Sequence, residues 1–189
     1  MIVEVTFGQA TESQALRRAW EDHVRTLRDA GTWLGGVAGT TDDGRFVAVV
    51  RTSASPTVTA AESLAPDLAA PPEVLRSDHL IVAYEDRPWD ARFVQVMSAR
   101  VLSRARYQEV EARIGQAFLD NRPDVLASYR TWPRDDLVIA VDHFSSEEEA
   151  RAGEQRELPP NLREGFQEWL ALLEETFWFD LTDPWLAPA

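Results

Sequence analysis

Two polar residues stand at matching ends of strongly apolar segments, and their side chains are the first candidates for chemistry. Arg51 follows the run Phe46–Val50, and His143 lies near the end of the run that begins at Leu137. Polar groups inside apolar strands cost free energy unless they are paired, so such residues are site candidates. An arginine can stabilise an enolate or a carboxylate, and a histidine can move a proton near neutral pH. We therefore predict Arg51 and His143 as catalytic candidates; the alternative is that both lie at a hydrated sheet rim.

A second group of candidates belongs to the hairpin that ends near His143. Tyr129, Arg130 and Trp132 lie on its first arm, and Asp142 lies on its second. Because side chains alternate between the two faces of a strand, Asp142 faces opposite to His143 and can accept a hydrogen bond from Arg130. The sequence predicts these four residues, Tyr129, Arg130, Trp132 and Asp142, as ligand-binding candidates. A purely structural ion pair between Arg130 and Asp142 is the alternative.

Composition excludes several other kinds of site. The 189 residues include no cysteine, and all 19 basic residues are arginine, so thiolate nucleophiles, cysteine-based zinc sites and lysine Schiff bases are excluded. The three histidines form no i, i+4 pair, so we predict no metal site and expect no cofactor. Gly35, Gly36 and Gly39 precede a strand rather than a helix, which is not the dinucleotide-binding pattern.

The charge and hydropathy of the chain argue against several classes of partner and against a membrane location. The acidic chain has a net charge of −13, which would repel nucleic acid and anionic membrane surfaces. No run approaches the ~18 apolar residues that a membrane helix needs. Met1 leads directly into a strand, so we expect a cytoplasmic protein.

These candidates are positioned by elements that occur twice. Each half reads as strand, amphipathic helix, two strands around a tight turn, helix and strand, and residues 45–50 match residues 137–142 at a spacing of 92. The first helices match at a spacing of 94, and we place repeats at 1–89 and 90–189. The predicted strands are 2–7, 32–40, 46–51, 79–84, 93–101, 125–132, 137–144 and one from 177.

The predicted helices begin at recognisable capping residues. Thr11 with Gln14 has the capping-box pattern, and Ser103 precedes the corresponding helix of the second half. A shorter helix is expected over residues 59–64, and another follows Ser146 with acidic residues in its first turn. Pro159 and Pro160 break that helix, and Asn161 with Glu164 three residues on predicts a further one. Two βαββαβ units are thus expected.

The element order resembles the dimeric α+β barrel superfamily, whose members have a ferredoxin-like fold. The residues that carry the resemblance are the two hairpins and the junction His143-Phe144-Ser145-Ser146-Glu147-Glu148-Glu149-Ala150-Arg151. The superfamily includes antibiotic-biosynthesis monooxygenases, haem-degrading monooxygenases and stress-responsive barrel proteins. The resemblance implies an α+β fold in which two ferredoxin-like repeats pack their antiparallel sheets into one pseudo-dimeric barrel, as a monomer or as a homodimer.

The resemblance also implies functions that the residues can test. Haem-degrading members carry an Asn in the first strand and a His on the second helix of a unit, and neither feature is present at the matching positions. Cofactor-independent oxygenation of aromatic compounds uses Trp, Tyr, Asn and Arg, for which Trp132, Tyr129 and Arg130 could serve. We therefore expect a protein that binds a small apolar or aromatic ligand and resembles a monooxygenase without metal or haem. The alternative is a non-catalytic binding or stress-response module.

Overall fold

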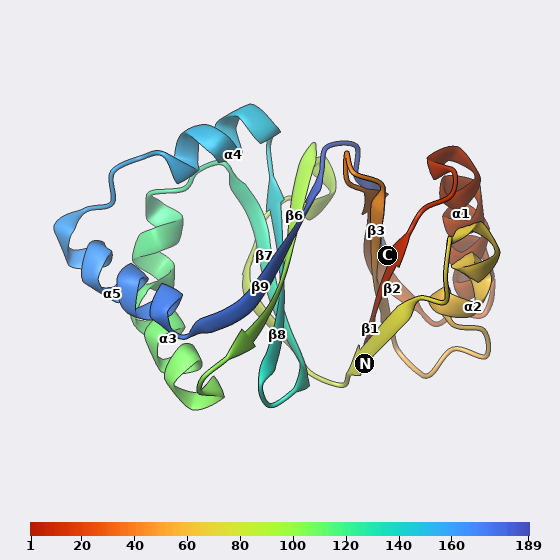
Figure 1. Cartoon of the computed structure of the whole chain (residues 1–189), viewed down its shortest axis with the longest axis horizontal. Coiled ribbons are helices and arrows are strands. Elements are labelled where there is room, and N and C mark those ends of the chain that lie inside the picture. The colour runs from red at the N-terminus through yellow and green to blue at the C-terminus, as the bar shows by residue number, and fades with distance from the viewer. The chain divides into compact units, whose positions relative to one another are not determined.

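The computed structural model describes residues 1–189, apart from the side chain of Asn161. The chain divides into two compact units. The first joins Met1–Leu80 with Phe179–Ala189, and the second is Ile81–Trp178. Each unit is built around one five-stranded antiparallel sheet with its helices on one face (Figure 1). The predicted α+β class with two ferredoxin-like repeats is confirmed.

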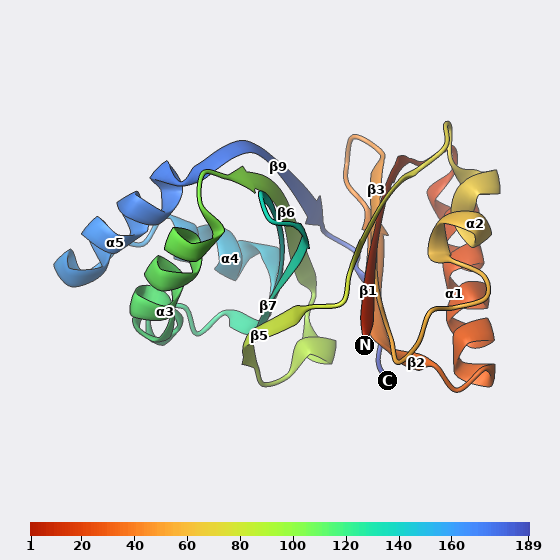
Figure 2. The same ribbon diagram turned by 90° about the horizontal axis from the view of Figure 1, so that it is seen from below.

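The first sheet has the strand order β10-β2-β3-β1-β4. Helices α1 and α2 run along the same face of this sheet (Figure 2). Their apolar stripes, which include Leu16, Trp20 and Leu64, pack on Phe46, Ala48 and Val50 of the sheet. The elements are β1 (Ile2–Gln9), α1 (Ser13–Asp29), β2 (Trp33–Thr40), β3 (Arg45–Thr52), α2 (Ala60–Leu64), a 3-10 turn (Ala65–Asp67), β4 (Glu73–Ser77) and β10 (Trp185–Ala187).

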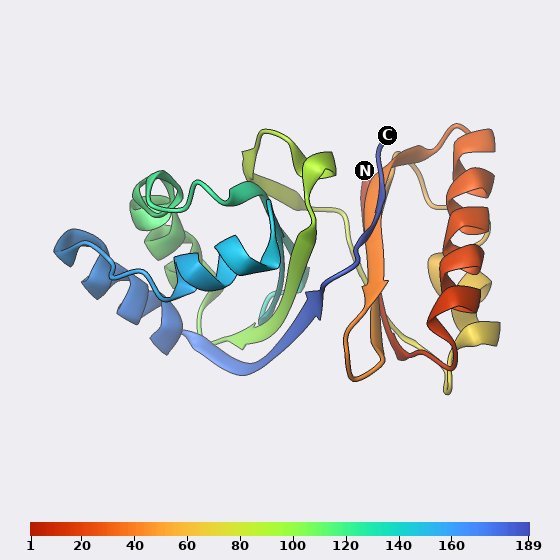
Figure 3. The ribbon, with the colours of Figure 1, turned by 90° about the horizontal axis from the view of Figure 1, so that it is seen from above.

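The second sheet has the strand order β5-β7-β8-β6-β9. Helices α3, α4 and α5 lie on one face of it, and α5 runs directly into β9 (Figure 3). The elements are β5 (Leu80–Glu85), a 3-10 turn (Pro88–Asp90), β6 (Phe93–Val101), α3 (Arg104–Asp120), β7 (Val125–Arg134), β8 (Leu137–Phe144), α4 (Glu147–Glu154), α5 (Pro160–Ala171) and β9 (Leu173–Leu181).

Each sheet contains the four strands of one repeat. Its fifth strand is the segment that follows the last strand of the other repeat along the chain. β5 follows β4 along the chain but pairs with β7, and β10 follows β9 but pairs with β2. The predicted fourth strand of the first repeat, 79–84, is therefore wrong in its assignment, because that segment is β5. The fourth strand is instead Glu73–Ser77, paired with β1. A five-residue strand preceded by Pro71 and Pro72 carries too weak a pattern to be recognised.

The two repeats can be superposed by their strand registers. Val3 pairs with Arg51 in the first sheet, and Val94 pairs with His143 in the second. Helices α1 and α3 begin at Ser13 and Arg104, so their spacing is 91 residues, and the predicted 94 is wrong. A shift of three residues is almost one helical turn and keeps the apolar stripe in place, so the stripe alone cannot fix this register.

Two of the predicted caps are confirmed and the one at Thr11 is wrong, while the predicted Asn161 cap depends on a side chain outside the described part of the chain. The Ser103 and Ser146 hydroxyls accept hydrogen bonds from the backbone N–H groups of Arg106 and Glu149. Helix α1 instead begins after Glu12 without a side-chain cap, because the Thr11 hydroxyl donates to the backbone carbonyl of Asp67. The proposed repeat boundary at residues 89 and 90 and the closure of the sheets into one barrel stay predictions. Across the described residues, no helix has the length and apolar character needed to span a bilayer.

Candidate functional site

The second unit buries a charged cluster between its sheet and α3. Arg130 on β7 donates from Nε to a Glu111 carboxylate oxygen on α3 at 2.8 Å and from Nη1 to Asp142 on β8 at 2.9 Å. The Ser128 hydroxyl donates to the same Asp142 oxygen at 2.6 Å. The three charged side chains are only 12–21% exposed. The predicted pair of Arg130 and Asp142 is present, and α3 adds a second carboxylate to it.

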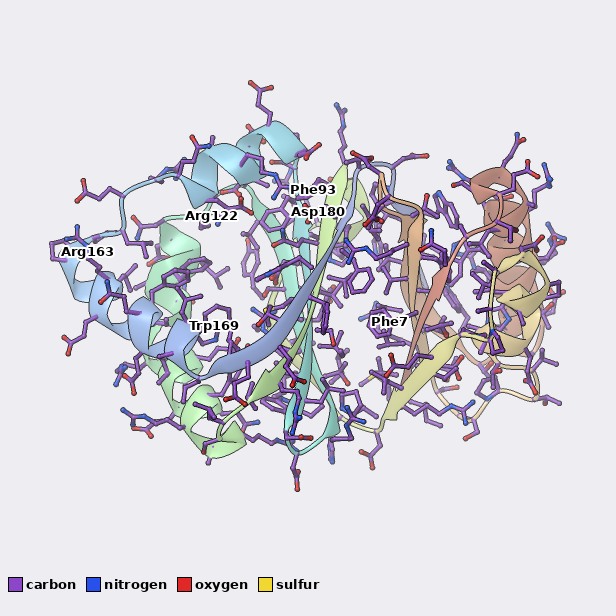
Figure 4. The ribbon with its side chains drawn as sticks, viewed as in Figure 1. Phe7, Phe93, Arg122, Arg163, Trp169 and Asp180 are labelled. Carbon is purple, nitrogen blue, oxygen red and sulfur yellow. The ribbon has the colours of Figure 1, made fainter. Side chains whose placement is uncertain are left out.

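Aromatic side chains enclose this cluster on the helix side of the sheet. Tyr107 on α3 meets Trp132 on β7 edge-to-face at 5.3 Å, and Trp169 on α5 lies 5.8 Å from the Tyr107 ring. Figure 4 shows Trp169 at the end of α5 that is nearer the sheet. The Arg104 guanidinium lies 4.9 Å from the centre of the Trp132 ring. An apolar wall therefore lies directly beside buried charges.

The electrostatics of the cluster follow from its burial. Burial raises the pKa of Tyr107 to about 12, against the opposite influence of the Arg130 guanidinium, so its hydroxyl keeps its proton at neutral pH. Burial also opposes the charge of Arg130, but Asp142 and Glu111 hold the pKa of this arginine well above its ordinary value. The cluster thus combines a permanent cation with a neutral phenol.

Two polar hydrogens in this wall have no acceptor that the structure describes. The Tyr107 hydroxyl and the Trp132 indole N–H are buried and neither donates to a described group, while the Trp169 indole approaches the Tyr107 oxygen as a donor and opposes the rise of the Tyr107 pKa. Burying such a group without a hydrogen bond costs about 1–3 kcal/mol, so a native protein normally supplies a water or a ligand. The arrangement offers two donors to an acceptor atom placed beside the Arg130 cluster.

Two other predicted residues lie on the opposite face of the same sheet. The rings of Tyr129 and His143 meet edge-to-face at 5.5 Å, and the Tyr129 hydroxyl donates to a Glu85 carboxylate oxygen at 2.5 Å. His143 is buried, at 3% exposure. Tyr129 and His143 thus form a group of their own, separate from Arg130, Trp132 and Asp142.

Arg51 belongs to the first unit. It ends the apolar part of β3 and pairs across the sheet with Val3 and Gly35. The neighbouring Val50 belongs to the core under the helices, so Arg51 faces away from α1 and α2. The joint action of Arg51 and His143 stays a prediction.

Sequence reasoning missed three members of the cluster. Tyr107 fits the apolar stripe of its helix, which predicts core packing, and neither Glu111 nor Ser128 stands out in the sequence. A signal was available, because Glu111 follows Tyr107 by four residues and therefore lies on the same helix face. A charged residue on a stripe that faces a sheet requires a buried partner.

Comparison with solved structures identifies the fold. A proposed monooxygenase from Fusobacterium nucleatum superposes with a TM-score of 0.72 at 11% identity, over 99% of this chain and 94% of that one. A proposed monooxygenase from Lactobacillus acidophilus gives 0.65 at 11% identity, over 98% of both chains. An anthrone oxidase-like protein gives 0.65 at 12% identity, over 100% of this chain and 94% of that one.

Each unit of the chain therefore has a ferredoxin-like α+β fold. No family model matches its sequence, and no curated protein matches it either. Some dimeric α+β barrel proteins hold haem through a helical histidine, but α4 and α5 here contain none and His143 lies on β8, so the residues do not fit that group. Within the part of the chain that the structure describes, no three His, Asp or Glu side chains are grouped to hold a metal ion.

Proposed function

We propose that the second unit binds a small planar aromatic ketone or phenol between its sheet and α3, and that it oxidises this molecule with dioxygen. The observation that carries the proposal is the pair of buried, unpartnered donors, Tyr107 and Trp132, beside the Arg130 cluster. An aromatic ligand would lie against the Trp132 and Trp169 rings, and its oxygen would accept both hydrogen bonds.

The same groups support a specific reaction. A methylene group conjugated with an aromatic ketone, directly or through an aryl ring, loses a proton more easily when the resulting enolate oxygen is held by hydrogen-bond donors. Tyr107 and Trp132 would supply those donors, and the Arg130 cation would add electrostatic stabilisation. The carbanion then reacts with dioxygen to a peroxide, and loss of water leaves a new carbonyl: R₂CH₂ + O₂ gives R₂CO + H₂O. The Asp142 or the Glu111 carboxylate of the same cluster, both paired with Arg130, would accept the proton.

Anthrone is a suitable substrate for the test, because its oxidation to anthraquinone has this stoichiometry. The purified chain should consume one dioxygen per anthraquinone formed, above the uncatalysed rate measured without protein. Replacing one donor of such an enolate-binding pair typically lowers kcat by about 10²–10³-fold. We expect Tyr107→Phe to show that loss without a loss of folded protein, because it deletes a hydroxyl that donates to no group within the described structure.

His143→Gln serves as a comparison on the opposite face of the same sheet. If the reaction uses the helix side, this variant should keep the wild-type rate, whereas a loss confined to His143→Gln and Arg51→Gln would favour the first catalytic candidates. Binding of anthrone without dioxygen uptake would support the alternative of a non-catalytic binding module. Unchanged turnover in Tyr107→Phe and Trp132→Phe would contradict the proposed site.

A further inference from the structure

The second repeat has one more helix than the first. In the first repeat the five-residue α2 and a 3-10 turn complete the connection between β3 and β4, whereas the second repeat places both α4 and the 12-residue α5 between β8 and β9. Helix α5 packs on α3 as α2 packs on α1, and it brings Trp169 onto Tyr107. The repeat with the buried charged cluster is thus also the repeat whose first helix has the longer cover.

The contacts of α5 are concentrated on α3. Phe166 stacks on Phe118 at 5.9 Å, and Leu162 packs with Val110 and Ile114. Glu168 forms ion pairs with Arg106 and Arg113 of α3, at side-chain exposures of 29–48%. Exposed ion pairs of this kind contribute little to stability.

The two ends of α5 are held differently. At its C-terminal end the Leu172 carbonyl accepts a hydrogen bond from the Leu102 backbone N–H at 3.0 Å, and the chain enters the sheet. Two residues into β9, Glu175 has a φ of +43°, the one positive value among the described residues other than glycine. Such a conformation is strained for a residue with a side chain, and strain of this kind is common at hinges. Figure 4 shows Arg163 at the end of α5 that is farther from the sheet.

We propose that α5 is a hinged lid that turns about its C-terminal end, near Glu175, and opens the layer around Tyr107 and Trp132. This inference rests on the proposed function, since it assigns to α5 the control of access to that ligand site. When the lid is closed, Trp169 covers Tyr107. When the N-terminal end of α5 moves away from α3, the tyrosine hydroxyl and the Trp132 ring become accessible.

The packing of α5 on α3 provides a direct way to lock the lid. A Cβ atom built on Gly165 would lie 3.8 Å from the Cβ of Ile114, which is the mean separation in a disulfide. The chain contains no cysteine, so Ile114→Cys with Gly165→Cys would introduce one defined crosslink. The single variants Ile114→Cys and Gly165→Cys are the matched controls.

Anthrone is the probe for the locked lid, used without dioxygen so that it is not consumed. Stopped-flow fluorescence should show that oxidation of the double variant slows binding and release at least tenfold, that a reducing agent restores both rates, and that oxidant leaves the single variants unchanged. Equal rates in the oxidised and reduced double variant would overturn the lid. If wild-type protein does not bind anthrone at all, the proposed function fails.

Hydrogen exchange tests the motion without any ligand. Amides of α5 should exchange faster than those of β8 in the wild-type protein, and the oxidised crosslink should slow them at least tenfold. Glu175→Gly relieves the strained backbone and should change the α5 exchange rate, whereas Glu175→Gln removes only the charge and should leave it as in wild type. If the α5 amides exchange as slowly as those of β8 and the crosslink does not change their rate, the lid proposal is contradicted. This outcome does not depend on whether anthrone binds.

Discussion

At the positions where the second repeat has Glu111, Arg130 and Asp142, the first has Trp20, Ala38 and Val50. The strand registers and the helix starts align these residues. The three residues of the first repeat belong to one buried apolar cluster. At these three positions the same backbone arrangement therefore holds either apolar or charged side chains. The proposed chemistry uses the charged set, which only the second repeat has at these positions.

Removing the cation should have the largest effect on stability. Arg130→Met leaves the Glu111 and Asp142 carboxylates buried without a partner, so we expect the free energy of unfolding to fall by about 3–5 kcal/mol. The triple variant Glu111→Trp, Arg130→Ala and Asp142→Val copies the first repeat and should recover most of that loss. Urea denaturation measures both. A triple variant as unstable as Arg130→Met would show that the two interiors are not interchangeable.

Exchanging a small residue between the repeats should have a smaller effect. Gly36 is the counterpart of Ser128, and a Cβ at Gly36 would lie 2.6 Å from the Val49 carbonyl oxygen and 2.8 Å from the Trp33 ring. Gly36→Ser should therefore cost about 1–3 kcal/mol through overpacking.

The reverse change, Ser128→Gly, loses one hydrogen bond to Asp142 and some backbone rigidity. We expect it to cost about 1–2 kcal/mol. Thermal unfolding followed by circular dichroism compares the two. An unchanged melting temperature in Gly36→Ser would contradict the overpacking expected from these two short distances.

The smallest expected effect is a pH dependence confined to the first repeat. His23 is 2% exposed, and burial lowers its pKa below the ordinary value of 6.5, against the opposite influence of Glu4. The unfolded chain therefore binds a proton more readily, so the stabilisation by neutral His23 is complete above pH 6.5 and is lost as the pH falls toward the folded-state pKa.

Its counterpart in the second repeat is Ile114, which does not titrate. Unfolding free energies measured between pH 7.5 and 5 should fall less in His23→Leu than in the wild type. An equal slope in His23→Leu and the wild type would assign the pH dependence to other groups.

The fold was largely predictable because its signals are local. The hairpins and the Ser103 and Ser146 caps each depend on a few neighbouring residues. The exchange of β5 and β10 was not predictable, because alternation shows that a segment is a strand but not which sheet it joins. Of the site, Arg130 and Asp142 could be paired from strand alternation alone. To predict the roles of Glu111 and Tyr107, the alignment of α3 with α1 must be known. The apolar stripe leaves this alignment ambiguous by one helical turn.

The position of β10 has a consequence for how the protein is made. Trp185 lies in the core of the first unit, and the Pro188 carbonyl accepts a hydrogen bond from the Trp33 indole at 2.8 Å. The first unit therefore cannot complete its sheet until β10 has been synthesised. At about 5–20 residues per second, the ribosome needs roughly 5–20 s to add the chain between Leu80 and Phe179. During that interval the unpaired edge of β2 is available for incorrect pairing.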